Sequence, residues 1–472
     1  MIKFILNNKN VSTSLPPGTP VLDFVRYRKQ LMGTKIGCRE GDCGACTVLV
    51  GDLNEGELRY RTATSCLMPL GNAHGKHIVT VEGINMSDLN PIQQAMSDES
   101  ATQCGFCTPG FVMSLAGFCL SKKAPTVQNS IAAIDGNICR CTGYKSIKRA
   151  AARVANLLAQ RSEGTPIQFA VEQEILPAYF SNIQERLQAL SLSLNGELGN
   201  DNPLAQRVGG GTDLYVQKHD EIKDASIQFL FDDADLKGIR QDGNQCIIGP
   251  ASTVTDLIES AVMQTYFPDF KLYTKLVSST PIRNMATVGG NFINASPIGD
   301  FTIFFLALDA TLTLSNGVTE RELPLRDLYL GYKTLDKQSA EYLKQIRFEL
   351  PNVTTRFNFE KVSKRTHLDI ASVNSAIKLT VEGDVITSVT LSAGGVAPIP
   401  KRLFKTEEFL TGQFVTEEMI MEATSVAQSE ISPISDARGT EAYKRLLLSQ
   451  LIKAHFIRLF PELNVEQLLV IS

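Results

Sequence analysis

Three cysteines within residues 38–46 constrain the fold of this chain more than any other feature. Four residues separate Cys38 from Cys43 and two separate Cys43 from Cys46, while Cys66 follows after nineteen more. Glycines are interleaved with these cysteines, and a backbone without Cβ atoms can bend tightly and point its N–H groups at sulfur. The segment therefore predicts a loop of thiolates wrapped around a compact inorganic centre.

The spacing indicates which centre the loop holds. A C-x4-C-x2-C run with a distant fourth cysteine is typical of plant-type [2Fe-2S] sites. Four cysteines can also close a tetrahedral zinc site, but such sites usually combine two C-x2-C pairs. We interpret the loop as an iron-sulfur site and keep zinc as the alternative.

A second set of cysteines lies in a region with helical patterning, from about residue 90 to 159. Cys104 and Cys107 precede one predicted helix, and Cys139 and Cys141 precede another. The positive ends of the two helix dipoles favour negative charge at these thiolates. The pattern predicts a second cluster inside a bundle of four helices, again with zinc as the alternative.

Composition and charge exclude several classes of protein. A length of 472 residues predicts about three domains. The net charge of -4 gives no reason to expect a nucleic acid or an anionic membrane as partner. No segment has the apolar length of a membrane span, and residues 1–8 are better interpreted as a strand than as a signal peptide. Reduced thiolate ligands indicate the cytoplasm, and Cys119 and Cys246 are expected to be ordinary buried thiols.

Two glycine-rich stretches lie in the middle of the chain. Residues 207–214 place three glycines between an apolar residue and a hydroxyl, and residues 287–300 surround a double glycine with hydroxyl, amide and carboxylate groups. Backbone turns of this kind can hold phosphates. The first stretch matches neither G-x-G-x-x-G nor a P-loop, and runs of glycine are most often just turns. Its pairing with the second stretch, about eighty residues later, favours a flavin pyrophosphate site. The last unit, from about residue 357, shows no catalytic constellation.

In this order, the four blocks resemble the small subunit of bacterial xanthine dehydrogenases, within the molybdenum hydroxylase family. The residues that carry the resemblance are Gly37 to Cys46, Gln103 to Gly110, Asn137 to Tyr144, Gly210 to Leu214, Ile282 to Asn284, Thr287 to Asn291, Ala295 to Asp300, Gly394 to Pro398 and Asp436 to Thr440.

The resemblance implies a function and a set of cofactors. It implies two [2Fe-2S] clusters and one FAD on this chain, with molybdopterin on a separate large subunit that oxidises xanthine or hypoxanthine. Electrons would pass through the helical-domain cluster, the ferredoxin-like cluster and FAD to NAD+. The resemblance implies a heterotetramer of two small and two large subunits, without nucleic acid or membrane. No residue of this chain would hydroxylate substrate.

The resemblance also assigns site residues by position. The predicted cluster ligands are Cys38, Cys43, Cys46 and Cys66 for one cluster and Cys104, Cys107, Cys139 and Cys141 for the other. The predicted FAD-contacting residues are Val208, Gly209, Gly210, Gly211, Thr212, Asp213, Thr287, Val288, Gly289, Gly290, Asn291, Asn294, Asp300 and, on a weaker match, Lys361.

The expected architecture is an α+β multidomain chain. Its predicted parts are a ferredoxin-like [2Fe-2S] domain (1–84), a helical [2Fe-2S] domain (85–162), a linker (163–195), an FAD-binding domain of the PCMH type (196–352) and a small α+β C-terminal domain (353–472). The linker is expected to include an amphipathic helix at about 180–192. Two alternatives stay open. One is the same role in a hydroxylase of aldehydes or N-heterocycles, and the other is a non-enzymatic iron-sulfur or zinc scaffold.

Overall fold

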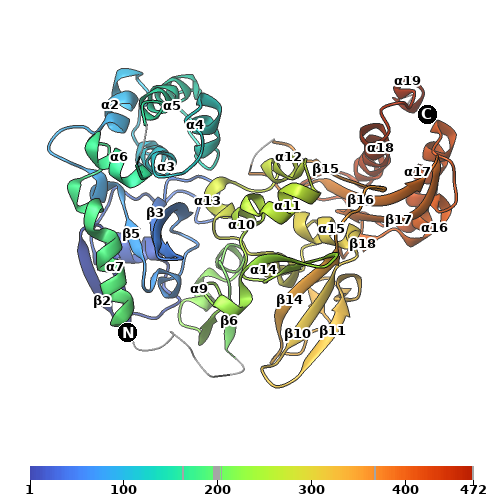
Figure 1. Ribbon diagram of the computed structural model, residues 1–472, viewed down its shortest axis with the longest axis horizontal. Coiled ribbons are helices and arrows are strands. Elements are labelled where there is room, and N and C mark those ends of the chain that lie inside the picture. The colour runs from blue at the N-terminus through green and yellow to red at the C-terminus, as the bar shows by residue number, and fades with distance from the viewer. Residues whose placement is uncertain (162–163, 195–201, 203–204, 366–367, 470–472) are drawn as a thin grey trace. The chain divides into compact units, whose positions relative to one another are not determined.

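The computed structural model describes residues 1–161, 164–194, 202, 205–365 and 368–469 (Figure 1). The chain forms two compact units. The first contains residues 1–232 and 279–286, and the second contains residues 233–278 and 287–472. In the part of the chain that is described, no helix has the length and apolar character needed to cross a bilayer.

The first unit begins with a five-stranded mixed sheet in the order β2-β1-β5-β3-β4. Its strands are β1 (Ile2–Leu6), β2 (Lys9–Thr13), β3 (Thr47–Asn54), β4 (Glu57–Thr64) and β5 (His77–Val79). Only β1 and β5 pair in parallel. Strand β1 confirms the strand predicted within residues 1–8.

The four predicted helices follow this sheet. They are α2 (Pro91–Asp98), α3 (Thr108–Cys119), α4 (Val127–Ala133) and α5 (Lys145–Leu158). Helix α3 is buried on nearly all sides, as its all-round apolar sequence requires, and it packs between the bundle and β3. Sheet and bundle therefore share one apolar core.

Residues 164–194, which were predicted as part of a linker, form helices packed on this core. They contain α6 (Pro166–Glu172), the 3-10 turn η4 (Ala178–Asn182) and α7 (Ile183–Leu192). Phe180 and Ile183 are buried in the shared core, and the Tyr179 hydroxyl donates to the carbonyl of Gly83 at 2.8 Å. The predicted boundaries at 162/163 and 195/196 lie outside the described residues.

A buried histidine sits under these helices. His77 Nε2 lies 2.9 Å from the Asn7 carbonyl, which can only accept, so Nε2 carries the proton and Nδ1 accepts from the Tyr60 hydroxyl at 2.7 Å. Burial lowers the pKa of His77 to about 3. The ring is therefore neutral in the folded protein at neutral pH.

This histidine should make stability fall with acid. Below the ordinary pKa of 6.5 the unfolded chain binds a proton at His77 that the folded chain excludes until about pH 3, so stability rises with pH across that window. The contribution is at most about 1.4 kcal/mol per pH unit. Urea unfolding at several values between pH 5 and pH 7 should show a shallower pH dependence for His77→Gln than for the natural chain. An unchanged slope would contradict the assignment.

The second unit contains two larger sheets. The first has the order β11-β10-β14-β9-β8. Its strands are β8 (Ile239–Asp242), β9 (Gln245–Ile248), β10 (Thr311–Ser315), β11 (Glu320–Pro324) and β14 (Tyr342–Glu349). Short helices lie in the chain between β9 and β10, including α10 (Val254–Glu259), α11 (Ala261–Tyr266) and α12 (Phe270–Lys275).

The second sheet of this unit is antiparallel, in the order β15-β16-β17-β18. Its strands are β15 (Thr355–Val362), β16 (Val373–Glu382), β17 (Val385–Gly394) and β18 (Lys401–Arg402). The buried helix α15 (Asp300–Ala307) packs on it, and so do α16 (Phe404–Leu410) and α18 (Glu441–Leu459). Helix α17 (Glu417–Glu430) packs against α16 and α18 and contributes to the same core.

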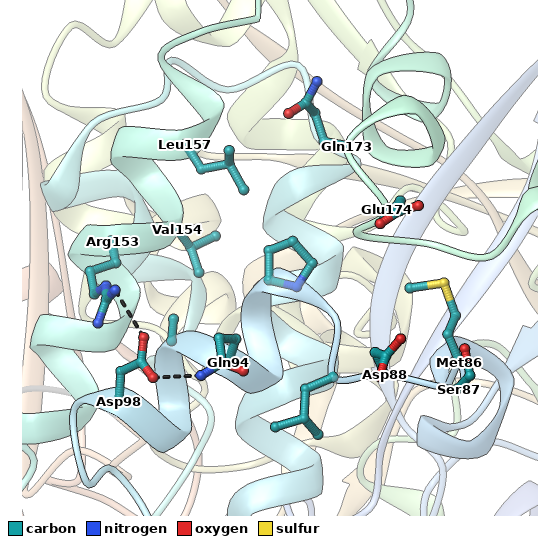
Figure 2. Close-up of a pocket in the computed structure, with 13 residues that line it drawn as sticks. Met86, Ser87, Asp88, Gln94, Asp98, Arg153, Val154, Leu157, Gln173 and Glu174 are labelled. Carbon is teal, nitrogen blue, oxygen red and sulfur yellow. Dashed lines mark hydrogen bonds and ion pairs between the residues drawn. The ribbon is translucent and has the colours of Figure 1, made fainter.

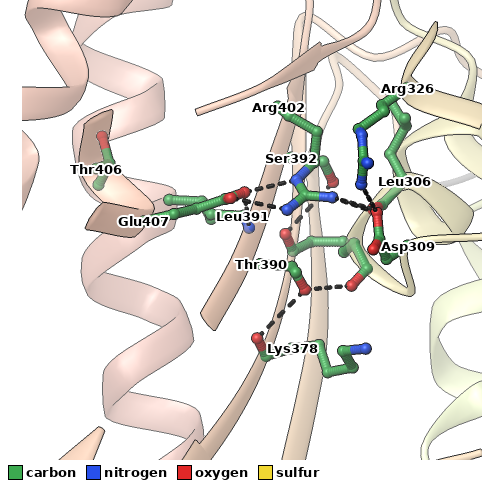
Figure 3. Close-up of polar contacts among 12 residues, drawn as sticks. Leu306, Asp309, Arg326, Lys378, Thr390, Leu391, Ser392, Arg402, Thr406 and Glu407 are labelled. Carbon is green, nitrogen blue, oxygen red and sulfur yellow. Dashed lines mark hydrogen bonds and ion pairs between the residues drawn. The ribbon is translucent and has the colours of Figure 1, made fainter. Parts of the chain in front are cut away.

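A buried arginine ties this sheet to α15 (Figure 3). Arg402 makes two charge-assisted bonds with Glu407, at 2.6 and 2.7 Å, and a third with Asp309 at 2.9 Å. Such forked pairs fix geometry as well as charge. The contact joins β18, α16 and the end of α15, and we interpret it as structural.

Candidate functional site

The pairing of two strands brings half of the first cysteine set together. Thr47 at the start of β3 pairs with Thr64 at the end of β4. Cys46 directly precedes Thr47 and Cys66 comes two residues after Thr64, so the two cysteines meet in the buried interior. A hydrogen bond between the two sulfurs lowers the pKa of Cys46 and raises that of Cys66. These sulfurs form one close pair.

The other two cysteines of the loop form a second pair. The hydrogen bond with Cys43 lowers the pKa of Cys38 to about 5 and raises that of Cys43. Backbone N–H groups of Glu40 and Cys43 also donate to Cys38 Sγ, at 3.3 and 3.4 Å. The loop thus directs amide hydrogens at sulfur, as its glycine content predicted, and this arrangement stabilises a thiolate.

The cysteines of the helical bundle are paired in the same way. Cys104 and Cys141 are exposed, and their sulfurs are 3.5 Å apart. Burial and a hydrogen bond with Cys139 raise the pKa of Cys107 to about 12. These sulfurs lie just before α3 and α5, so the predicted positions at two helix N-termini are confirmed.

The paired arrangement fits a two-iron cluster. In the described part of the chain, no three metal-binding side chains are grouped as around a single ion. Each set instead offers two pairs of sulfurs, and a [2Fe-2S] cluster needs two thiolates for each of its irons. The eight predicted cysteines could therefore hold two clusters.

The two cysteine sets are linked by one backbone hydrogen bond. The Ile138 N–H, next to Cys139, donates to the carbonyl of Cys43 at 3.0 Å. The Asn137 side chain donates to the carbonyl of Gly44 at 3.1 Å, and a Cβ at Gly44 would overlap the carbonyl of Gly136. Sequence reasoning identified the cysteines on both sides but missed this bridge, whose only signal was the Asn-Ile dipeptide before Cys139.

The first glycine-rich stretch approaches the ferredoxin-like loop within the first unit. It follows β6 (Gln206–Val208), which pairs in parallel with β7 (Ile227–Phe229), and it ends at the short helix α8 (Leu214–Gln217). Gly211 has φ +80°, and a Cβ there would lie 2.9 Å from the carbonyl of Leu67. Leu67 directly follows Cys66, so this predicted flavin loop touches the backbone beside a predicted cluster ligand.

Residues 279–286 are also anchored on the cysteine loops. They contain the short helix α13 (Thr280–Arg283). Asp135, from the loop after α4, accepts from the Thr280 N–H at 2.8 Å and forms a buried ion pair with Arg283. The Ile282 side chain lies against Gly41, where a Cβ would be 2.6 Å away. This segment immediately precedes the second glycine-rich stretch in the chain.

The second glycine-rich stretch lies in the second unit. Thr287 caps α14 (Val288–Asn294), because its hydroxyl accepts from the Gly290 N–H at 3.1 Å. Asn291 accepts from the Thr302 N–H at 3.0 Å, and Asn294 accepts from Lys333 at 2.9 Å. The predicted residues 287–291 therefore form a capped turn, and Asn291 fixes it to α15.

Asp300 and Lys361 form a buried ion pair in the second unit. Their charged atoms are 2.7 Å apart, and the side chains are 13% and 0% exposed. Lys361 also donates to the Leu276 carbonyl at 2.8 Å, while Asp300 accepts from Asn374 at 2.7 Å. The structure thus brings these two predicted flavin residues together and engages the ammonium with protein groups. Their contact with FAD stays a prediction.

Four protein families match the chain in sequence. Residues 4–71 match a 2Fe-2S iron-sulfur cluster binding domain, and residues 80–152 match a [2Fe-2S] binding domain. Residues 182–352 match the FAD binding domain in molybdopterin dehydrogenase, and residues 359–459 match the CO dehydrogenase flavoprotein C-terminal domain. The chain therefore carries domains for 2Fe-2S clusters and for FAD.

The curated proteins that are similar to this chain include several xanthine dehydrogenases. A xanthine dehydrogenase of Emericella nidulans is 29% identical over 90% of this chain, and xanthine dehydrogenase 1 of Arabidopsis thaliana is 28% identical over 95%. The matched regions cover 36% and 39% of those proteins. The chain thus spans less than two fifths of the length of these relatives.

Similar solved structures cover a smaller part of the chain. Carbon monoxide dehydrogenase from Oligotropha carboxidovorans matches 57% of this chain and 94% of its own, with 26% identity and a TM-score of 0.52. Quinoline 2-oxidoreductase from Pseudomonas putida 86 matches 55% and 90%, with 20% identity and a TM-score of 0.51. The second likeness concerns the fold alone.

Proposed function

Because its four domains make this chain an iron-sulfur and FAD component of the molybdenum hydroxylase family, we propose that it is the electron-transfer subunit of a purine hydroxylase. A partner subunit with molybdopterin would oxidise xanthine or hypoxanthine, and NAD+ would be the final acceptor. When bound, the clusters relay single electrons and FAD combines them into a hydride. The residues of this chain hold and orient those groups.

The observation that carries the proposal is the order of contacts within the first unit. At one end, Cys104 and Cys141 are exposed, where a partner can approach. In the middle, the Ile138 N–H joins the loop of Cys139 to the loop of Cys43. At the other end, the backbone after the buried Cys66 touches Gly211 of the predicted flavin loop. These contacts support the transfer of electrons from a partner subunit through two clusters to FAD.

The curated relatives favour a purine as substrate. The xanthine dehydrogenases match at least 90% of this chain, including both the cluster and flavin regions, whereas the carbon monoxide dehydrogenase structure matches 57%. A hydroxylase of an aldehyde, an N-heterocycle or carbon monoxide is the second candidate, and the carbon monoxide dehydrogenase structure supports the last of these substrates. Reduced thiolate ligands fit a cytoplasmic location.

Assay of the purified complex tests the substrate. The chain is co-expressed with its large-subunit partner, and NADH formation is followed with xanthine, hypoxanthine, nicotinate and an aldehyde. We expect turnover with the purines and a complex of two small and two large subunits. Turnover with only the aldehyde or nicotinate would contradict the purine assignment. A colourless chain without iron or flavin would instead support a scaffold.

The partner should protect the helical-domain cluster. In the chain alone, an iron chelator should remove the cluster at Cys104 and Cys141 first, because these sulfurs are exposed whereas Cys46 and Cys66 are buried. Electron paramagnetic resonance (EPR) spectra of the reduced protein distinguish the two losses. Addition of the partner should slow the first loss and leave the second unchanged. Equal slowing of both losses, or of neither, would contradict docking at this face.

A further inference from the structure

Asn72 connects the ferredoxin-like domain to the first predicted flavin loop. It lies in the 3-10 turn η2 (Leu70–Ala73), which follows Cys66, and it is 3% exposed. Its Nδ2 donates to the carbonyl of Gly209 at 2.9 Å. The residue falls between the matched domains at 4–71 and 80–152, so none of the family descriptions assigns it a role.

The turn that carries Asn72 is fixed against the strands beside the flavin loop. A Cβ at Gly71 would overlap the ring of Phe229 on β7, the strand paired with β6. Lys76, three residues after this turn ends, forms an ion pair with Asp232 at 2.6 Å and is itself nearly buried. Asn72 is therefore held rigidly at the start of the glycine-rich stretch.

The carbonyl oxygen of the Asn72 side-chain amide has no hydrogen-bond partner among the described residues. This oxygen, Oδ1, is nevertheless buried. Exchanging the amide nitrogen and oxygen would place two acceptors together, since the Gly209 carbonyl can only accept, so the orientation is fixed. Both atoms are bonded to the same carbon, so Oδ1 also lies beside the flavin loop. A buried unpaired acceptor costs free energy unless a ligand or water satisfies it.

We propose that Asn72 binds FAD from the ferredoxin-like domain. Its Nδ2 holds the Gly209 carbonyl in place, and its Oδ1 accepts a hydrogen bond from a hydroxyl or N–H group of the cofactor. This inference rests on the proposed assignment of residues 208–213 to FAD. It adds a cofactor contact from the same domain that holds the ferredoxin-like cluster, and so makes flavin binding depend on that domain.

Binding of FAD to variants at position 72 tests the inference. Flavin is removed from the full chain and FAD is titrated back, while iron content and EPR signals report the clusters. Asn72→Ala should bind FAD about tenfold more weakly, because it loses both hydrogen bonds. Asn72→Asp should bind no more tightly than Asn72→Ala, because a carboxylate cannot donate to the Gly209 carbonyl. The matched control is His74→Ala, in the same turn, whose side chain contacts the Lys3 N–H instead.

The readouts separate a cofactor contact from a structural role. Iron contents of the flavin-depleted variants should equal those of the natural chain, and the rise in thermal midpoint caused by FAD should be smaller for Asn72→Ala. Natural affinity in Asn72→Ala would overturn the inference, as would a parallel loss of iron and flavin. A natural chain that binds no FAD would instead overturn the flavin assignment itself.

Discussion

The Cys139→Ser variant is expected to lose one of the two iron-sulfur signals and to reduce its flavin more than about a hundredfold more slowly when electrons come from the partner. Cys139 is buried, it pairs with Cys107, and its neighbour Ile138 makes the hydrogen bond to the loop of the other cluster. The serine hydroxyl is a poor replacement for a thiolate ligand. Iron per chain should fall by about half, and FAD content should not change.

A matched control exists for this variant. Cys119 lies in α3, is fully buried, and has its pKa raised to about 12 by that burial, so it stays a thiol. Cys119→Ala should therefore keep all iron and both signals in the EPR spectrum of the reduced protein. Full iron in Cys139→Ser would show that Cys139 is not a ligand. Equal losses in both variants would point to general misfolding instead.

Loss of the Asp300 carboxylate should strongly destabilise the second unit. In Asp300→Ala, the Lys361 ammonium would stay buried with only the Leu276 carbonyl as partner. Removing one member of a buried ion pair costs about 3–5 kcal/mol. Hydrogen exchange of the amides in β15 and β16, measured without FAD, should report this loss. FAD should also bind more weakly if Asp300 contacts it as predicted.

Two further variants make this test decisive. The double variant Asp300→Leu/Lys361→Met should be less destabilised than the sum of its single variants, because it leaves no unpaired charge. The control is Glu320→Ala, which breaks the Lys344–Glu320 pair, whose side chains are 44% and 47% exposed. That change should cost less than about 1 kcal/mol. Similar losses for Asp300→Ala and Glu320→Ala would contradict a buried pair.

The cysteine loops could be predicted from sequence because their chemistry is local. The intervals between Cys38, Cys43 and Cys46 are short, so spacing and glycine content already specify a loop. The contact between Cys46 and Cys66 depends instead on the register of β3 and β4, and the bridge from Ile138 joins residues far apart in the chain. Such contacts are set by tertiary packing, which periodicity does not encode.

In the flavin region, too, the contacts set by tertiary packing could not be predicted from the sequence. Asp300 and Lys361 were predicted separately, as positions in two motifs, and nothing in the sequence indicated that they pair. Residues 163–195 were interpreted as a linker with one amphipathic helix at about 180–192, because their apolar pattern is weak. Phe180 and Ile183 are nevertheless buried against the sheet. Short helices on a preformed core need only a few apolar anchors.

The hydrogen bond between Ile138 and Cys43 has a consequence for maturation. It holds the loop of one cysteine set against the loop of the other, so neither loop reaches its final shape alone. Iron delivered to the buried sulfurs of Cys46 and Cys66 has to arrive before the core residues around them, such as Val208 and Met285, pack in place, whereas Cys104 and Cys141 stay accessible afterwards. Assembly of the metal centres should therefore proceed in a fixed sequence, with the ferredoxin-like site filled first.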